Sequence, residues 1–368
     1  MPVISFLMQP EIGHILPTLR IARKLAHRGH IVRFFGLEHF RELIELSGAT
    51  LVPVLGDLDC ATGKPEVFRG SISTERLFHP LHGTLATSTQ QLWANVSNTL
   101  RSLPSDILLI DSGILTPTSS RVLVTLAPRV RRINVVLPDF RQVDLKGVVI
   151  PEIILCPASF ELPARPAPNH PHVFCEPSVF LERPKLDFPV TWIDRSKLLI
   201  YCSFGSQTHL YSEKDALVEI ITRAFAGLPN VQLLLAIGGQ RVPSASEYMA
   251  PNVLLCSRVD QLQVLKHASL FISHGGLGSI KEAILAGVPT LILPFSYDQP
   301  INAQRIEFHR LGRSMQITGA TSAKIRDLAF QIITDRKIHN NVERFRVDFQ
   351  DQEDRGISIN ETERALSA

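Results

Sequence analysis

Short apolar runs alternate with stretches of helical spacing along this chain, and no other feature limits the fold as strongly. Residues 3–8 are typical of a buried strand, and residues 14–28 follow with apolar side chains at helical spacing. Gly29 comes after the basic last turn of that helix, in the position of a C-cap. The pattern repeats through predicted strands at 30–36 and 50–55. Such alternation predicts a parallel β-sheet with helices on its faces.

A second alternating run begins at residue 197, and a proline-rich stretch at 157–192 separates the two runs. Proline at this density excludes both a helix and a central strand, so we interpret the stretch as the connection between two domains. The chain has 368 residues, which also suits about two domains. We therefore predict an α/β protein with two Rossmann-like, doubly wound parallel-sheet domains: residues 1–182 and 197–348, joined by a linker at 183–196 and followed by a charged tail at 349–368, which is either loosely held or packed back on the first domain.

The composition indicates a globular protein with no nucleic-acid partner. Hydrophobic residues make up 45% of the chain, charged residues 20%, and the formal net charge is +3. The short basic cluster of Arg129, Arg131, Arg132 and Arg141 is interpreted as a solvated loop, because a membrane-surface patch needs a longer basic amphipathic helix. Peripheral contact with a membrane therefore has no support in the sequence.

Five scattered cysteines without a CxxC pair indicate neither a disulfide framework nor a zinc site. The N-terminal apolar run has about six residues, too few for a signal peptide, and no stretch reaches the roughly 18 apolar residues of a membrane helix. We expect a protein of the reducing cytoplasm.

A glycine-rich turn between a strand and a helix is the first candidate binding element. His274 follows the apolar run "LFIS", glycines occupy 275, 276 and 278, and Ser279 is expected to open the helix. Glycines allow a ligand to approach the backbone closely, and the first N–H groups of a helix favour an anion. Ser279 is expected to cap the helix, to bond a phosphate oxygen, or to do both. A tight strand-to-helix turn without a ligand explains the glycines equally well.

Three further features suit the other groups of a nucleotide sugar. The stretch "SFGS" at 203–206 is a second strand-end turn with hydroxyl groups. Glu282 lies one helical turn after Ser279, where a carboxylate can accept hydrogen bonds from a ribose diol, although an ordinary exposed glutamate would look the same. Asp298 and Gln299 end the next strand-like run, and acid and amide groups suit sugar hydroxyls. Together these features describe a nucleotide-sugar site.

Most of the candidate donor-site residues lie in a longer stretch that resembles a known family. The stretch "DQLQVLKHASLFISHGGLGSIKEAILAGVPTLILPFSYDQPINA" (260–303) resembles the donor-binding signature of the family 1, GT-B-fold glycosyltransferases, which include plant UDP-glycosyltransferases and bacterial macrolide and other natural-product glycosyltransferases. "GHILPTLRIARKLAHRGHIVRF" (13–34) resembles the opening of the same family, and the resemblance covers nearly the whole chain. It implies two Rossmann-like domains that face each other across a cleft, the first for an acceptor and the second for the donor.

The resemblance also implies roles for the donor-site residues. His274 and Ser279 would contact the diphosphate, with Ser206 assisting from the other turn, and Glu282 would hold the ribose. Four further residues complete the implied donor-binding set near these groups: Gly13, Gln261, Gly276 and Gly278.

Sugar and base recognition follow from the same resemblance. Asp298 and Gln299 would contact the sugar hydroxyls, and Gln299 favours a glucose-type donor. Where relatives carry a tryptophan that stacks on the base, this chain has Arg258, followed by "VDQ". A guanidinium plane can stack on a base, and the Val259 backbone can read its edge. The expected donor is UDP-glucose, and a TDP-sugar is the alternative donor.

The general base is expected in the first domain. His14 follows the first predicted strand at the start of a helix, whose N-terminus disfavours a charged imidazolium. An imidazole with a pKa near about 6.5 can take a proton from a hydroxyl at neutral pH. The resemblance implies that His14 is this base and that Asp111 orients it, as in a catalytic dyad. A capping or merely exposed histidine is the alternative for His14, and His30 is interpreted as non-catalytic.

The expected reaction is a single displacement with inversion at the anomeric carbon. No DxD-like acidic pair lies in the candidate donor turns, so no metal or cofactor is expected, and the NDP-sugar is a co-substrate. Two alternatives remain open: a GT-B-fold nucleotide-sugar epimerase, and a non-catalytic helper of a partner glycosyltransferase.

The acceptor is expected to be a small, apolar molecule with a hydroxyl group. Candidate acceptor residues within 60–100 and 112–150 are Phe68, Phe78, Trp93 and Ile114. Core packing explains each of them equally well. The region after Asp111 is short for the family, so the acceptor pocket is expected to be unusually open or to be completed by a partner.

Overall fold

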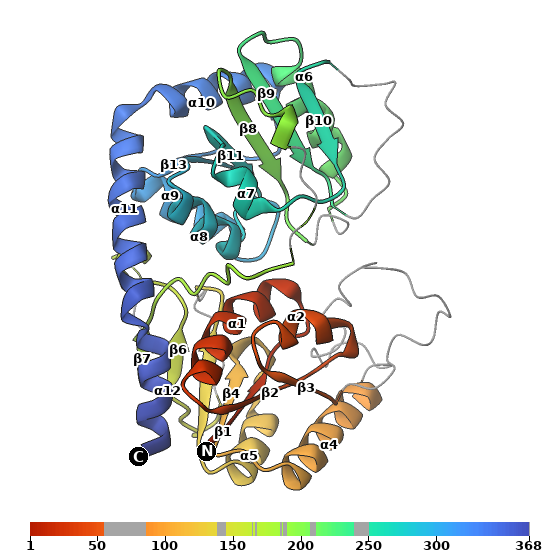
Figure 1. Cartoon of the computed structure of the whole chain (residues 1–368), viewed down its shortest axis with the longest axis vertical. Helices are drawn as coiled ribbons and strands as arrows, with labels where there is room; N and C mark the ends of the chain where they lie inside the picture. Colours follow the sequence, from red (N-terminus) through yellow and green to blue (C-terminus); the bar gives the residue numbers. More distant parts are fainter. Residues whose placement is uncertain are drawn as a thin grey trace. The chain divides into compact units, whose positions relative to one another are not determined.

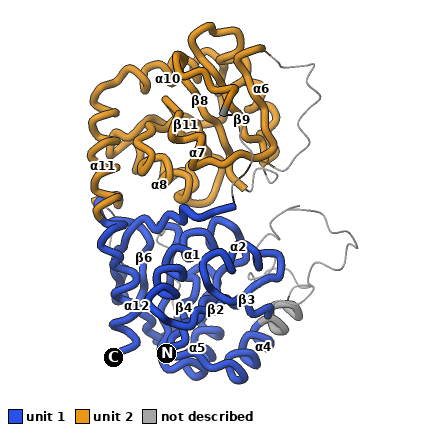
Figure 2. Tube along the Cα trace, viewed as in Figure 1, with its two compact units in different colours: residues 1–159, 164–184, 352–368 blue, residues 160–163, 185–351 orange. Residues whose placement is uncertain are grey.

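The structure is a computed structural model of the chain (Figure 1). It describes residues 1–54, 86–137, 145–163, 165, 168–184, 186, 190–206, 211–238 and 250–367. The chain divides into two compact units (Figure 2). Unit 1 comprises residues 1–159, 164–184 and 352–368, and unit 2 comprises residues 160–163 and 185–351.

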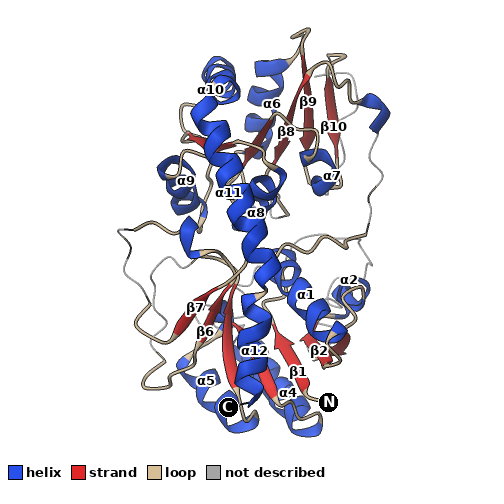
Figure 3. Ribbon diagram, turned by 60° about the vertical axis from the view of Figure 1, so that its left-hand side comes forward, coloured by secondary structure: helices blue, strands red, loops and turns tan. Residues whose placement is uncertain are grey.

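Unit 1 contains, among its described residues, a seven-stranded sheet in the order β3-β2-β1-β4-β5-β6-β7, in which every neighbouring pair is parallel. The chain winds from β1 toward β3 and then returns to β4 and continues toward β7. Right-handed crossovers therefore place α1 and α2 on one face and α4 and α5 on the other, and Figure 3 shows helices on both sides of the strands. The elements are β1 (Val3–Leu7), α1 (Ile12–His27), β2 (Ile31–Gly36), a 3-10 turn (Glu38–Phe40), α2 (Arg41–Glu45), β3 (Thr50–Pro53), α4 (Ala86–Ser102), β4 (Ile107–Asp111), a 3-10 turn (Ser112–Ile114), α5 (Pro117–Leu126), β5 (Val130–Asn134), β6 (Glu152–Ile154), a 3-10 turn (Ala158–Phe160), β7 (His172–Phe174) and α12 (Ile357–Ser367).

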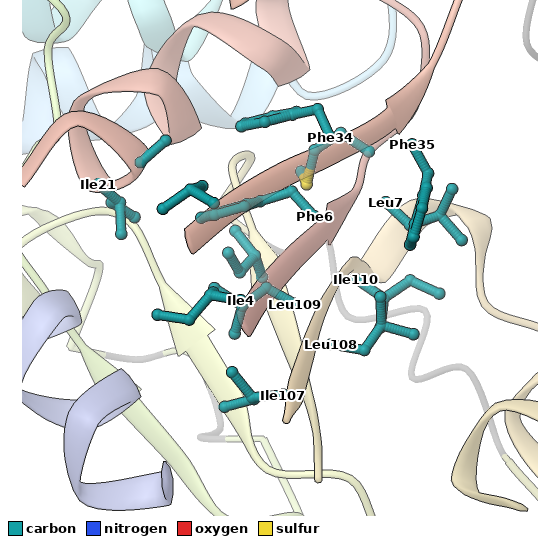
Figure 4. Packing of buried hydrophobic residues seen from close by; sticks show 14 of the residues in the cluster. Ile4, Phe6, Leu7, Ile21, Phe34, Phe35, Ile107, Leu108, Leu109 and Ile110 are labelled. Atoms are coloured by element: carbon teal, nitrogen blue, oxygen red, sulfur yellow. The ribbon is translucent and has the colours of Figure 1, made fainter. Parts of the chain in front are cut away.

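The central strands β1 and β4 are apolar except for Ser5 and the terminal Asp111, because helices cover both faces of the sheet. All five residues of β4 are buried. Figure 4 shows part of this core, in which Phe6 and Phe34 stack with their ring centroids 4.6 Å apart. Ile4 and Leu109 pack in the same cluster. This rigid centre fixes the carboxyl ends of β1 and β4.

Unit 2 contains, where it is described, a six-stranded parallel sheet in the order β10-β9-β8-β11-β12-β13. Here the direction of winding reverses between β8 and β11. The elements are a 3-10 turn (Val190–Trp192), β8 (Leu198–Ser203), α6 (Lys214–Phe225), β9 (Val231–Ala236), β10 (Val253–Cys256), α7 (Gln261–Leu265), β11 (Leu270–Ser273), α8 (Leu277–Ala286), β12 (Thr290–Ile292), α9 (Gln299–Phe308), β13 (Gly312–Ser314), α10 (Ser322–Thr334) and α11 (Arg336–Arg355). The prediction of two parallel-sheet α/β domains is confirmed.

The charged end of the chain is ordered and belongs to unit 1. Helix α11 continues to Arg355, and α12 follows it with Ile359 fully buried. The backbone N–H of Ser358 donates to Glu176 Oε2 at 3.0 Å. Glu353 Oε1 accepts from the Val179 N–H at 2.8 Å. These buried contacts hold residues 352–368 within unit 1, so the loosely held alternative does not describe this segment.

Two local interpretations from the sequence are wrong. The proline-rich stretch is not solely a connection, because it contains β7, which pairs with β6 at the end of the sheet order. An edge strand is where proline is tolerated in a sheet. Arg132 is not in a solvated loop: it lies in β5, is 6% exposed and has Nη2 3.3 Å from Glu152 Oε2. Among the described helices, none has both the length and the apolar composition needed to cross a membrane.

Candidate active site

The winding direction of unit 1 reverses between β1 and β4, and His14 and Asp111 lie at this point. The strands β1 and β4 are neighbours, Asp111 is the last residue of β4, and His14 is the third residue of α1. His14 Nδ1 is 2.7 Å from Asp111 Oδ2. In open parallel sheets, ligands bind beyond the carboxyl ends of the strands at such a reversal. The structure therefore brings the predicted dyad together where a ligand site is expected.

Asp111 is held so that it fixes the orientation and the tautomer of the imidazole. Its side chain is 2% exposed, whereas that of His14 is 15% exposed. The Gly113 N–H donates to Oδ1 at 2.8 Å, and the Gln9 N–H donates to Oδ2 at 3.3 Å. An ionised carboxylate can only accept hydrogen bonds, so Nδ1 of His14 must carry the hydrogen. In the neutral ring, Nε2 is then the basic nitrogen.

In unit 2 the corresponding reversal lies between β8 and β11, and two loops meet there around His274. A Cβ atom added at Gly205, in the turn after β8, would lie 2.6 Å from His274 Cε1. A Cβ atom added at Gly276, in the turn after β11, would lie 2.5 Å from His274 Nε2. Any other residue at either glycine would displace the ring. The imidazole is therefore packed between the two turns that the sequence predicted to bind phosphate.

The packing around His274 favours its neutral form. Desolvation on burial lowers its pKa from the ordinary value to about 4, against a smaller opposing effect of a hydrogen bond to the Ser203 backbone. A neutral imidazole supplies an N–H group to an anion without adding a full positive charge. The N-terminus of the helix that follows supplies positive electrostatic potential at this site.

Helix α8 begins at Leu277, with Gly276 as its N-cap, two residues before the predicted start. The alternative in which Ser279 caps the helix is wrong, because Gly276 is the N-cap and Ser279 lies in the first turn. Glycine offers no side-chain acceptor to the first-turn N–H groups. Gly278 lies in this first turn, and a Cβ atom added there would meet nothing within 4 Å. Glycine in a helix costs about 1 kcal/mol relative to alanine. Packing within the described residues does not require it, and the helix N-terminus keeps open space for an anion.

A hydrogen-bonded network joins three predicted donor-site residues. Gln261 Nε2 donates to Glu282 Oε2 at 2.8 Å and to Ser279 Oγ at 3.3 Å. Glu282 is 6% exposed, so it is not an ordinary surface glutamate. The Tyr201 hydroxyl donates to Gln261 Oε1 at 3.1 Å. The sequence did not identify Tyr201, whose only signal is its place in β8 beside the turn at 203–206.

The remaining predicted donor residues occupy the loops at the same ends of the strands. Arg258 is exposed and Val259 is buried, immediately before the Asp260 N-cap of α7. Ser206 is exposed at the end of the described part of its turn. Gly13 is exposed in the first turn of α1, where an added Cβ atom would meet nothing within 4 Å. Gly13 belongs to unit 1 and the others to unit 2.

Gln299 has an internal role that the sequence did not predict. It is 4% exposed, and its Oε1 accepts from the N–H groups of Phe295 at 2.8 Å and Ser296 at 3.1 Å. Its Nε2 donates to the Tyr211 hydroxyl at 2.8 Å. These bonds account for the carbonyl oxygen and one amide hydrogen. Gln299 therefore shapes the loop before α9, whatever else it contacts.

Asp298 is connected to the glycine-rich turn through Asn302, which the sequence also left without a role. Asn302 Nδ2 donates to Asp298 Oδ2 at 2.8 Å and to the Gly275 carbonyl at 2.9 Å. Asn302 Oδ1 accepts from Arg305 Nη1 at 2.7 Å, and Arg305 forms a two-pronged ion pair with Glu161, at 2.8 and 3.0 Å from Nη2. Arg305 and Glu161 lie 144 positions apart, so no local pattern marks the pair.

The predicted acceptor residues lie with the core where they are described. Ile114 is 2% exposed within the core of unit 1, and Trp93 packs against that core. Phe68 and Phe78 lie outside the described residues. His30 Nε2 lies 3.0 Å from Glu363 Oε1, so its ion-pair partner is not a residue of the dyad. Among the described residues, no group of three or more His, Cys, Asp or Glu side chains could hold a metal ion.

Comparison with curated proteins identifies a family of sugar-transferring enzymes. Residues 194–355 match the family described as "UDP-glucoronosyl and UDP-glucosyl transferase". The chain is similar to the NDP-glycosyltransferase YjiC of Bacillus subtilis (strain 168), with 23% identity over 95% of this chain and 93% of the relative. It is also similar to the oleandomycin glycosyltransferase of Streptomyces antibioticus, with 27% identity over 41% of this chain and 34% of the relative.

Solved glycosyltransferase structures share the fold of both units. The glycotransferase of kitacinnamycin has a TM-score of 0.77 and 20% identity, with 100% of each chain covered. The glycosyltransferase VinC, solved in complex with dTDP, has a TM-score of 0.74 and 16% identity, with 99% of each chain covered. The family match and the relatives agree with this fold. Residues 194–355 match this family, both units have the GT-B fold, and the whole chain is similar to family 1 glycosyltransferases, enzymes that transfer a sugar from an NDP-sugar donor.

Proposed function

We propose that this enzyme transfers glucose from UDP-glucose to a hydroxyl group of a small apolar acceptor, with inversion and without a metal ion. The observation that carries the proposal is the His14 imidazole, oriented by a buried carboxylate at 2.7 Å. The family description, which refers to UDP-glucosyl transfer, supports the donor. The dTDP bound by VinC makes a TDP-sugar the alternative.

The proposed step needs one base and one leaving-group site. Nε2 of His14 takes the proton of the acceptor hydroxyl while the acceptor oxygen attacks the anomeric carbon. The bond from that carbon to the diphosphate oxygen breaks, and the leaving diphosphate takes its electrons. Asp111 stabilises the imidazolium that forms. The N-terminus of α8 and the N–H of His274 stabilise the negative charge of the diphosphate.

Thermal-shift measurements with UDP, TDP and GDP test the donor assignment. A nucleotide that binds the native protein raises its melting temperature. At a nucleotide concentration of 100 times the Kd, the free energy of unfolding increases by about 2.7 kcal/mol. We expect UDP to give the largest shift. The preferred donor, incubated with a panel of phenols, macrolides and sterols, should then yield a glycosylated product by mass spectrometry. A larger shift with TDP than with UDP would make thymine, rather than uracil, the nucleobase of the donor. No shift with any nucleotide would overturn the proposal.

Replacing Glu282 with alanine is expected to weaken UDP binding about tenfold or more, because hydrogen bonds to charged groups contribute about 1.5–3 kcal/mol. A carboxylate has about four acceptor sites, and Gln261 Nε2 donates to one oxygen of Glu282 at 2.8 Å. Calorimetric Kd values for UDP and 2′-deoxy-UDP measure the effect. The native enzyme should prefer UDP, and Glu282→Ala should bind the two nucleotides equally. Equal weakening of both nucleotides would contradict the ribose role.

Replacing Gly205 with alanine is expected to weaken UDP binding by displacing the His274 ring. The new methyl group would lie 2.6 Å from His274 Cε1, and Gly205 has φ of +79°. Gly227 is a matched control, since its φ is +76° but an added Cβ atom meets nothing within 4 Å. Both alanine variants should lose similar stability from backbone strain. Calorimetry should show a raised Kd for UDP in Gly205→Ala alone, and unchanged binding in that variant would refute the role of the ring.

A further inference from the structure

Tyr297 has a backbone conformation that is unfavourable for its side chain. Its φ is +57°, in the left-handed region that glycine and asparagine adopt readily and bulky residues avoid. The residue is nevertheless 60% exposed. Burial of the ring in the core therefore does not explain the strain. Strained residues that persist in a fold concentrate at ligand sites.

The strained position is fixed from both sides in the sequence. Before Tyr297, the N–H groups of Phe295 and Ser296 both donate to Gln299 Oε1, at 2.8 and 3.1 Å. After it, the Asp298 carboxylate accepts from Asn302 Nδ2 at 2.8 Å. These bonds hold the loop in one conformation, so the position of the ring is determined by the loop.

The same bonds place this loop beside the glycine-rich turn. Asn302 Nδ2 bonds both to Asp298 and to the carbonyl of Gly275, at 2.9 Å. A Cβ atom added at Gly275 would lie 3.3 Å from the Gln299 carbonyl oxygen. Strands β11 and β12 are parallel neighbours, so the turn and the loop both follow the carboxyl ends of the strands. Tyr297 is therefore one residue from a carboxylate that is connected to the candidate diphosphate site.

We propose that Tyr297 is a specificity-determining residue that packs its ring against the sugar ring of the donor. The inference rests on the proposed function and deepens it. A pyranose ring presents C–H groups on its faces and hydroxyl groups at its edge. An aromatic ring suits the first surface, and the adjacent Asp298 carboxylate suits the second. A hexose attached to the diphosphate would then be held by both residues.

The proposal separates sugar recognition from nucleotide recognition. Tyr297 should contribute to the affinity for UDP-glucose and should not contribute to the affinity for UDP, which lacks the sugar. Glycine in place of Tyr297 removes the ring and also relieves the strain at positive φ. The variant should therefore be more thermostable than the native enzyme and at the same time bind the donor less well.

Calorimetric titration of UDP and UDP-glucose, with the melting temperature of each variant, tests the inference. We expect Tyr297→Gly to melt at a higher temperature, to keep the native Kd for UDP, and to raise the Kd for UDP-glucose about three- to tenfold. Tyr297→Phe, which keeps the ring, should bind both ligands as the native enzyme does. Arg310→Gly is the matched control, because Arg310 is exposed and has φ of +53° outside this loop. It should gain stability and keep both Kd values.

Failure of the inference differs from failure of the proposed function. If the native enzyme binds both ligands and Tyr297→Gly keeps the native Kd for UDP-glucose, the inference is overturned while the function stands. Equal weakening of UDP and UDP-glucose would also overturn it, since the residue would then serve the nucleotide or the loop. If the native enzyme binds neither ligand, the proposed function fails and the inference fails with it.

Discussion

Replacing His14 with alanine is expected to lower kcat by about 10²–10⁴-fold, the usual contribution of a general base, while the Kd for UDP stays unchanged. The two effects separate because the imidazole acts on the acceptor hydroxyl and the proposed donor contacts, apart from Gly13, lie in unit 2. Asp111 Oδ2 lies 2.7 Å from His14 Nδ1 and keeps the proton on that nitrogen. The substitution therefore removes Nε2, the nitrogen that accepts the proton of the acceptor. Initial rates with saturating donor and calorimetric titration of UDP provide the two measurements.

Two companion variants make the His14 result specific. Asp111→Asn retains the size of the side chain but removes the charge that orients the base, so kcat should fall while the Kd for UDP remains native. His30→Gln is the control, because His30 pairs with Glu363 and lies outside the dyad; its kcat should match that of the native enzyme. The acid limb of the pH profile should disappear in His14→Ala. An unchanged kcat in that variant would rule out His14 as the base.

Replacing Glu161 with alanine is expected to destabilise unit 2 by about 3–5 kcal/mol, the second large effect. Arg305 is fully buried, and Glu161 pairs with it through both carboxylate oxygens. The variant leaves a buried guanidinium without its counter-charge. The melting temperature of unit 2 should fall by roughly 10 °C, as measured by calorimetry.

Two further variants test the origin of this loss. Replacement of both Glu161 and Arg305 with methionine removes both charges and should be clearly less destabilising than Glu161→Ala. Glu343→Ala breaks an exposed ion pair with Arg346 and should leave the melting temperature unchanged. A loss in the double variant as large as in Glu161→Ala would show that packing, rather than the unpaired charge, dominates.

The fold and the two reversal points could be predicted because their signals are local. Parallel strands buried on both faces are continuous apolar runs, and the strand ends are marked by glycines and polar residues. His14, Asp111 and His274 each follow or end such a run. Their proximity to one another or to a glycine turn follows from the sheet order once the alternation is recognised. The sequence therefore predicted the position of these residues, and their chemical roles stay predictions.

The residues that the sequence misjudged depend on contacts distant in the chain or on backbone geometry. Glu161 was part of a presumed linker, and its partner Arg305 is 144 residues away. Gln299 matches the family motif, but its side-chain carbonyl oxygen accepts hydrogen bonds from two backbone N–H groups. Tyr297 was an ordinary aromatic residue until its positive φ was known. Neither periodicity nor residue type encodes these properties.

The assembly of unit 1 from both ends of the sequence has a consequence for synthesis on the ribosome. Translation proceeds from the N-terminus, so the sheet and helix α1 of unit 1 emerge before unit 2, while residues 352–368 emerge after it. Until then Glu176 lacks the Ser358 N–H, and Lys24 lacks the carbonyl of Glu353 to which it donates at 3.0 Å. Nearly all of unit 2 has been translated by that stage. The nascent first unit thus stays incomplete through most of translation, which makes it the part of the chain most exposed to misfolding and to chaperones.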